Sequence, residues 1–265
     1  MYHALLPPPT LANVPGQPKL PDVHIPAALF EQHLAWLHAE GYVTVTAAEF
    51  YRRWQARELP AHLVALTFDD GYRSLLDYAA PALKKYGFVA TLFLTTDFVG
   101  QPDFSTDAAF AQGAPPADRP LSWPEVRALQ AAGWAIEAHS LSHPPHAGLP
   151  AAELRQELVV SRQVIAEQLG TPPDFYAFPY GSYDRAALRA LLDAGYAAGF
   201  SVHDGPPRAG RDRRRLPRAE INTRCTPAVF ARLVRTGYAS AGARWRAALR
   251  DTVFHFPLVK DWVSG

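Results

Sequence analysis

VALTFDDGY, residues 64–72, is an apolar run that ends at two adjacent carboxylates and a glycine. Its first five residues, Val64–Phe68, predict a buried strand because they are mostly apolar or β-branched. Asp69 and Asp70 do not favour a strand, and two like charges side by side repel each other. A cation beside the two carboxylates would remove that repulsion. The structural alternative is that Asp70 only caps the helix that follows.

The same strand-then-helix unit recurs on both sides of this stretch. Capping boxes at Thr46–Glu49 and Ser122–Glu125 mark two of the helix starts. Strands that alternate with helices indicate parallel strands, and seven or so in one chain favour a barrel over two domains. We therefore expect one α/β domain over residues 1–265, a (β/α)7-type barrel on which the aromatic tail 239–265 packs. Strands are predicted at 42–45, 64–68, 89–94, 134–138, 175–178 and 197–202, separated by helices.

HSLSH, residues 139–143, directly follows the predicted strand 134–138. Two histidines four residues apart project to the same side of a helical turn, which suits two nitrogen ligands on one metal. Such a pair is a weak signal by itself, because the chain contains ten histidines. The pair gains weight from its position directly after a predicted strand, because the carboxyl ends of parallel strands meet at one mouth of a barrel. These histidines should therefore lie near Asp69 and Asp70.

FPYG, residues 178–181, follows the predicted strand 175–178. PYG is a turn sequence, and a tight turn is its structural interpretation. Its functional interpretation is that a rigid turn presents a backbone N–H and an aromatic side chain to a bound acyl group. One carboxylate and two imidazoles, with a position left for water, are typical of catalytic zinc sites. The second carboxylate is then placed to take a proton from that water.

These three motifs, in this order, resemble those of the polysaccharide deacetylase family (the NodB-homology domain, carbohydrate esterase family 4). The resemblance covers roughly residues 1–225, including LSWPEVRAL before the histidines and FYAFPYGSYD after the long helix. FPYG and the later LPR at residues 216–218 look closest to the branch that deacetylates poly-N-acetylglucosamine. The resemblance implies a distorted, incomplete (β/α) barrel that hydrolyses N-acetyl groups from an amino-sugar polymer and releases acetate.

The resemblance also implies a role for individual residues. One divalent metal ion would be bound, Zn²⁺ foremost and Co²⁺ or Ni²⁺ as alternatives, and Asp69 would be the general base. The backbone N–H of Tyr180 would stabilise the oxyanion, and Pro179 and Gly181 in the same turn would contact the substrate. The implied metal ligands are Asp70, His139 and His143.

Two positions depart from the family pattern. The family's third motif carries an arginine two residues before the proline, which orients the catalytic aspartate, whereas this chain has Ala177. We expect Arg218 to approach Asp69 from another strand and to replace that arginine. The family's last motif, which supplies a histidine general acid, is not recognisable here. His255 is a candidate by its late position and His146 by its proximity to the ligands, and a packed or solvated histidine is the alternative for each.

The composition limits the classes of protein and of partner. Hydrophobic residues make up 48% of the 265 residues and charged residues 19%, which provides a packed core and excludes a disordered or coiled-coil chain. The net charge of +1 supplies no attraction to nucleic acid or to an anionic membrane. No apolar run reaches the ~18 residues that span a bilayer, and we expect a monomer without an integral membrane segment. No signal peptide is visible at residues 1–7, so an extracytoplasmic location is implied by the resemblance alone.

The substrate is the least determined part of this prediction. We expect an N-acetylated glycan of the N-acetylglucosamine type. Fold and motifs do not separate it from peptidoglycan, chitin oligomers, a lipid-linked sugar or a non-sugar amide, because loops decide substrate choice. An alternative of another class is a glycan-binding protein that keeps the metal but has lost turnover. Asp69 argues against that alternative, because binding alone has no use for a general base.

Overall fold

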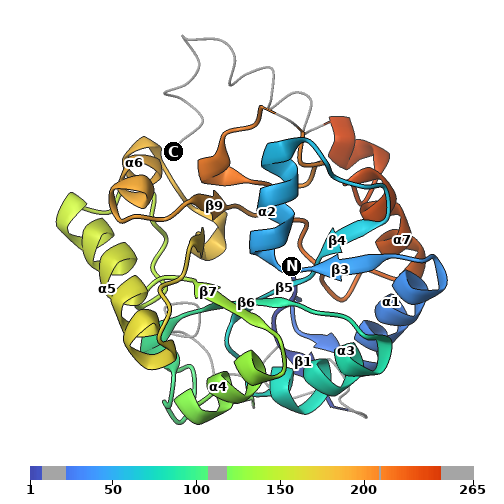
Figure 1. Ribbon diagram of the computed structural model, residues 1–265, viewed down its shortest axis with the longest axis horizontal. Coiled ribbons are helices and arrows are strands. Elements are labelled where there is room, and N and C mark those ends of the chain that lie inside the picture. The colour runs from blue at the N-terminus through green and yellow to red at the C-terminus, as the bar shows by residue number, and fades with distance from the viewer. Residues whose placement is uncertain (8–21, 107–117, 209, 246–265) are drawn as a thin grey trace.

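The computed structural model describes residues 1–7, 22–106, 118–208 and 210–245. Its centre is a five-stranded parallel sheet in the order β5-β6-β7-β8-β9, which curls into an open barrel with helices around its outside (Figure 1). Single-residue parallel bridges extend this sheet at both edges, where Tyr2 pairs with Phe68 and Leu216 pairs with Phe200. The expected α/β fold, an incomplete parallel barrel, is confirmed.

The elements follow the predicted alternation along the chain. The strands are β1 (Leu5–Leu6), β2 (Ile25–Pro26), β3 (Val43–Val45), β4 (Leu63–Ala65), β5 (Thr67–Asp70), β6 (Thr91–Leu94), β7 (Ala135–Ala138), β8 (Phe175–Ala177) and β9 (Ala198–Phe200). The α-helices are α1 (Ala27–Ala39), α2 (Ala47–Ala56), α3 (Ala80–Tyr86), α4 (Trp123–Ala131), α5 (Ala151–Leu169), α6 (Arg185–Asp193) and α7 (Pro227–Thr236). A π-helical turn, Leu75–Ala79, precedes α3, and short 3-10 turns occupy Thr96–Phe98, Pro179–Gly181 and Arg213–Arg215.

The decisive stretch 64–72 forms two strands instead of one. β4 pairs with β3 in a separate two-stranded sheet, whereas β5 pairs with β6 in the barrel. The division falls at Leu66, which is buried between them. The run 64–68 looks continuous in sequence because both of its halves are apolar or β-branched, although β4 is half-buried and β5 is buried. Only the change of pairing partner separates the two strands.

The predicted helix starts are confirmed by their capping contacts. The Thr46 side chain accepts a hydrogen bond from the backbone of Glu49, and both halves of the Ser122–Glu125 capping box are present. Asp184 caps α6 in the same way by accepting from the backbone of Ala187. These side chains satisfy N–H groups that a helix leaves unpaired, so the helices begin where the sequence predicts.

Helix α2 closes the end of the barrel at which the strands begin. The backbone N–H of Ala47 donates to Oγ1 of Thr91, the first residue of β6, at 2.9 Å. Tyr51 and Trp54 of α2 belong to one buried cluster with aromatic residues of β8 and β9. Figure 1 shows α2 across the middle of the barrel and the other helices at its periphery. Of the expected C-terminal tail, residues 246–265 lie outside the described residues.

Candidate metal centre and active site

The three motifs meet at the carboxyl ends of the strands, as the barrel argument predicted. Asp69 and Asp70 are the last two residues of β5, His139 directly follows β7, and Tyr180 lies in the turn after β8. The register of β5, β6 and β7 brings Asp70 level with Ala138 across the sheet. Residues far apart in sequence are therefore carried to one place by strand pairing.

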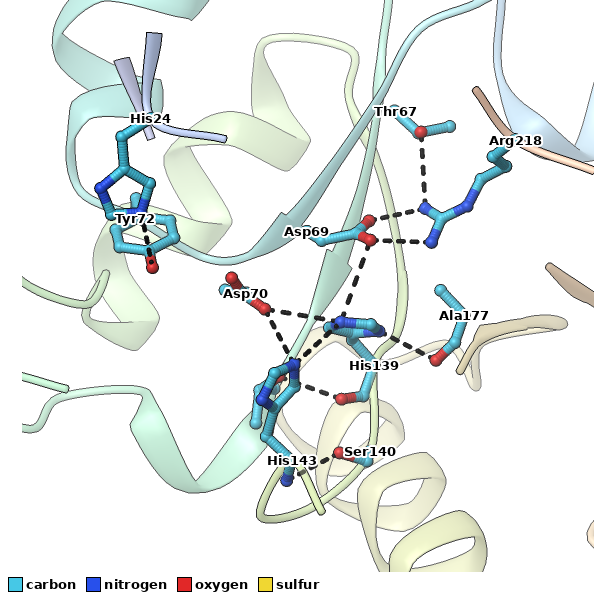
Figure 2. Close-up of polar contacts among 11 residues, drawn as sticks. His24, Thr67, Asp69, Asp70, Tyr72, His139, Ser140, His143, Ala177 and Arg218 are labelled. Carbon is cyan, nitrogen blue, oxygen red and sulfur yellow. Dashed lines mark hydrogen bonds and ion pairs between the residues drawn. The ribbon is translucent and has the colours of Figure 1, made fainter. Parts of the chain in front are cut away.

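Asp70, His139 and His143 form a cluster whose ligand atoms lie within 4.8 Å of one another, and all three residues are buried. Nε2 of His139 lies 3.3 Å from Nε2 of His143, and each nitrogen lies 3.4 Å from Oδ1 of Asp70 (Figure 2). Bonds of about 2.0–2.1 Å at tetrahedral angles would place neighbouring ligand atoms about 3.3–3.4 Å apart. The three separations therefore fit three corners of a tetrahedral divalent-metal site.

His139 is held in the form that a metal requires. Its Nδ1–H donates to the carbonyl oxygen of Ala177 at 2.9 Å, so its lone pair lies on Nε2, which faces Asp70. Burial lowers the pKa of His139 to about 3, even though the nearby Asp69 acts to raise it. The imidazole is neutral at pH 7, and the neutral form is the one that binds metals.

Asp69 lies beside the cluster and is held by Arg218. The guanidinium donates from Nη1 to Oδ1 at 2.6 Å and from Nη2 to Oδ2 at 2.7 Å, and both side chains are buried (Figure 2). Burial alone would raise the pKa of Asp69. The charge and hydrogen bonds of Arg218 outweigh burial, with help from His139, and hold that pKa well below its usual range. The approach of Arg218 to Asp69, expected because Ala177 replaces the family arginine, is present.

Backbone strain is concentrated in this site. Among the described non-glycine residues, five have a left-handed φ, and four of these are Asp70 (73°), Ser140 (74°), His143 (68°) and Tyr180 (57°). Each costs on the order of 1 kcal/mol and persists only where the surroundings enforce it. The helical turn predicted through residues 139–143 is therefore wrong. The stretch is a non-helical loop, and its left-handed residues bring the two imidazoles together.

A pocket of about 290 Å³ lies over the cluster and includes Asp69, Asp70 and both histidines in its walls. Phe178 and Tyr180 line it from the FPYG turn, and Tyr180 is 49% exposed. Pro179 and Gly181 are not among the lining residues, and their contact with substrate stays a prediction. Pro179 is buried, and a Cβ on Gly181 would lie 2.9 Å from Cβ of Val202, so both residues shape the turn.

His24 lines the site, and sequence reasoning missed it. It lines the same pocket, is 1% exposed, and its Nε2 lies 3.1 Å from the hydroxyl of Tyr72. Burial, followed by the charge of His3, lowers the pKa of His24 to about 3. In Figure 2 it lies on the other side of Asp70 from Asp69. Its only sequence signal is its place directly before β2, and a strand of two residues leaves no pattern to recognise.

The two histidines proposed from sequence as general acids fare differently. His146 does not line the pocket, because its Nδ1 donates to the carbonyl of Pro144 at 2.8 Å and its Nε2 lies 2.6 Å from the Tyr176 hydroxyl. It is a buried, hydrogen-bonded histidine, which agrees with the packed alternative given for it above. His255 lies outside the described residues.

Comparison with known families identifies the barrel. A profile described as polysaccharide deacetylase matches residues 56–199, more than half of the chain. The chain belongs to the polysaccharide deacetylase family. The matched range holds the DDG, HSLSH and FPYG motifs, whereas His24 and Arg218 lie on either side of it.

Individual relatives agree with this assignment. A Bacillus subtilis protein, YxkH, whose name places it among the polysaccharide deacetylases, is 28% identical over 192 residues, which span 72% of this chain and 62% of that protein. The poly-β-1,6-N-acetyl-D-glucosamine N-deacetylase of Staphylococcus epidermidis is 24% identical over 219 residues, 78% of this chain and 71% of that enzyme. The match thus covers less than two thirds of the first relative's length.

Solved structures share the fold. The Streptococcus pyogenes deacetylase PplD, solved in complex with acetate, superposes with a TM-score of 0.72 at 24% identity over 86% of this chain and 92% of its own. IcaB from Ammonifex degensii superposes with a TM-score of 0.71 at 23% identity, over 88% and 94% of the two chains. Within the described residues, no helix has the length and apolar character that crossing a membrane requires.

Proposed function

We propose that this protein is a metal-dependent hydrolase that removes N-acetyl groups from an N-acetylglucosamine polymer and releases acetate. One observation carries the proposal: the ionised Asp69, clamped by Arg218, lies beside three ligand atoms spaced for a tetrahedral metal. A structural metal site is closed by four protein ligands and has no need of a further ionised carboxylate. A hydrolytic site needs a base in that place.

Asp70, His139 and His143 are the proposed ligands of one divalent ion. Their mixed oxygen and nitrogen donor set suits Zn²⁺, and Co²⁺ or Ni²⁺ can occupy sites of this kind. Bound there, the ion supplies Lewis acidity to the acetyl carbonyl and lowers the pKa of water. The neutral His139 and the three matched separations support this assignment.

Asp69 is the proposed general base. Oδ2 of Asp69 lies 3.9 Å from Nε2 of His139, next to the ligand atoms, and both of its oxygens are held by Arg218. The carboxylate is ionised at neutral pH, so it accepts a proton from the water that adds to the acetyl carbon. Arg218 keeps the carboxylate charged and fixes its orientation.

Two further groups act on the acetamide. The backbone N–H of Tyr180 is proposed to donate to the developing oxyanion, because the turn that carries it lies at the pocket and is closed by backbone hydrogen bonds from Gly181 to Phe178 and from Ser182 to Pro179. As negative charge builds up on the acetamide, His24 is proposed to take a proton from solvent and to give it to the leaving nitrogen as the C–N bond breaks. Its ring is neutral in the free protein, and Asp69 returns to solvent the proton that it took from the water.

The substrate class rests on the relatives and on the pocket. The Staphylococcus epidermidis relative is a poly-β-1,6-N-acetyl-D-glucosamine N-deacetylase, and it aligns with 78% of this chain. The pocket is small, about 290 Å³, and the exposed Tyr180 ring at its wall offers an apolar face against which a sugar ring can pack. These features suit one N-acetylated sugar unit of a longer chain.

The test measures acetate release from N-acetylglucosamine oligomers, after chelation and again after Zn²⁺, Co²⁺ or Ni²⁺ is returned. Release should depend on the metal, and Asp69→Asn should lower it on the order of 10³-fold while metal still binds. His24→Gln should lower the rate at equal metal content. Absence of release from every oligomer, with metal bound, would favour another acylated substrate or a glycan-binding protein without turnover.

A further inference from the structure

A single buried carboxylate holds the loop that carries both histidine ligands. Glu157, on α5, is 6% exposed. Its Oε2 accepts hydrogen bonds from the backbone N–H groups of Leu141 and Ser142, each at 2.9 Å, and its Oε1 accepts from Oγ of Ser142 at 2.6 Å. Hydrogen bonds to an ionised carboxylate are stronger than those between neutral groups, and two successive N–H groups form a natural anion-binding hollow.

The segment after β6 binds carbonyl groups of the same loop. Oγ1 of Thr95 donates to the carbonyl oxygen of His139 at 3.0 Å, and the backbone N–H of Thr96 donates to the carbonyl oxygen of Ser140 at 3.3 Å. Within the loop, Oγ of Ser140 accepts from the backbone N–H of His143 at 2.9 Å (Figure 2). The loop is therefore held between the segment after β6, which donates to its carbonyl groups, and α5, which accepts from its central N–H groups.

We propose that Glu157 is a positioning residue for the metal site, an inference that rests on the metal-binding role proposed above. Leu141 and Ser142 lie between the two left-handed residues of the loop, Ser140 and His143. Glu157 binds the backbone N–H groups of Leu141 and Ser142. The strained backbone on either side then has no freedom to relax. Nε2 of His139 and Nε2 of His143 are kept 3.3 Å apart and facing Asp70.

The experiment compares Glu157→Ala and Glu157→Gln with a matched control, Glu153→Ala. Glu153 is exposed and lies one turn earlier on the same helix. The Zn²⁺ dissociation constant is measured by chelator competition, the visible spectrum is recorded with Co²⁺, and the unfolding midpoint is measured without metal. The Zn²⁺ dissociation constant and the Co²⁺ spectrum report the geometry of the ligands, and the unfolding midpoint reports overall folding. If Glu157 had a structural role only, its loss would change the unfolding midpoint and leave the other two unchanged.

Loss of an outer residue that orients metal ligands typically weakens binding 10–100-fold. We expect that loss in Glu157→Ala, together with an altered Co²⁺ spectrum. Glu157→Gln should stay within about threefold of the parent, because its amide oxygen accepts from both backbone N–H groups and its NH₂ donates to Ser142. Glu153→Ala should change neither the Zn²⁺ affinity nor the Co²⁺ spectrum.

A folded Glu157→Ala variant with parental Zn²⁺ affinity and Co²⁺ spectrum would overturn the inference. If that variant does not fold, Glu157→Asp replaces it, because the shorter side chain keeps the charge but cannot span all three donors. Parental Zn²⁺ affinity in Glu157→Asp would likewise overturn the inference. If the parent protein itself binds none of the three metals, the proposed function fails as well, so the two failures are distinguishable.

Discussion

The two ends of the barrel are built on opposite physical principles. At the carboxyl ends of the strands, buried charged and polar side chains converge, and four left-handed residues hold them in place. At the other end, α2 covers the strands with apolar contacts, in which Tyr51 packs edge-on against Phe175 at 5.3 Å between ring centroids. Burial of charge and backbone strain lower stability, whereas aromatic burial raises it.

We infer from this difference that the carboxyl end of the barrel provides the chemistry and the α2 end provides stability. Substitutions at the carboxyl end should alter chemistry more than stability, and substitutions at the α2 end should do the reverse. Phe93 links the two, because it belongs to the α2 cluster and its ring also lies 4.9 Å from the guanidinium of Arg218. The aromatic end thus supports the charged end directly.

Among the substitutions that compare the two ends of the barrel, Arg218→Ala is expected to have the largest effect. Without the guanidinium, burial dominates and the pKa of Asp69 rises, so less of the base is ionised at a given pH. We expect turnover to fall about 10²–10³-fold with metal content intact, and the acid side of the pH–rate profile to move to higher pH. Steady-state rates across pH, with metal analysis of each sample, measure this.

Arg218→Lys is the matched control for that variant. Lysine keeps the positive charge but loses the two-pronged contact, so its pH profile should shift less than that of Arg218→Ala. Unchanged turnover in Arg218→Ala would remove the proposed role of this residue. It would also contradict the expectation that substitutions at the carboxyl end alter chemistry more than stability.

The opposite end is tested by Trp54→Ala. Trp54 is 8% exposed and its indole N–H donates to the carbonyl of Arg208 at 3.1 Å. Its loss should lower the free energy of unfolding by about 3 kcal/mol, while turnover per folded molecule stays near the parental value. Chemical denaturation and active-site-normalised rates measure the two quantities. Arg52→Ala, an exposed position on the same helix, should leave the unfolding midpoint nearly unchanged.

A smaller effect is expected at Glu137, on β7 between the two ends. Its carboxyl accepts from the backbone N–H groups of Asp174 and Phe175, each at 2.9 Å, and burial raises its pKa to about 8 from an ordinary value of 4.5. The folded protein therefore holds this proton more tightly than the unfolded chain. The stability it contributes is complete below pH 4.5 and is lost as the pH rises toward 8.

Glu137→Gln tests this pH dependence, because an amide oxygen can accept the same two hydrogen bonds without ionising. The stability of the variant relative to the parent should rise with pH between about 5 and 8, by up to about 1.4 kcal/mol per pH unit. Denaturation curves at several pH values measure the difference. A difference that does not change with pH would show that Glu137 titrates normally.

The order of the strands and helices, and most residues of the site, could be predicted from local sequence. Alternating apolar segments and capping residues predict the order of strands and helices, because hydrophobic periodicity and caps act over a few residues. Asp69, Asp70, His139 and His143 were predicted as neighbours by one rule, that parallel strands end at one mouth. That rule needs only the order of the strands, which the sequence contains.

Contacts between distant segments are formed only in the tertiary structure. Arg218 and Asp69 are 149 residues apart, and their contact was expected from the family resemblance and not from any local pattern. His24 reaches the pocket from a segment with no recognisable motif. Strand pairing decides where residues 64–72 divide, and contacts from α5 and from the segment after β6 impose the left-handed loop at residues 139–143. Local preference does not specify such features, because their energies come from partners that the closed barrel alone brings within reach.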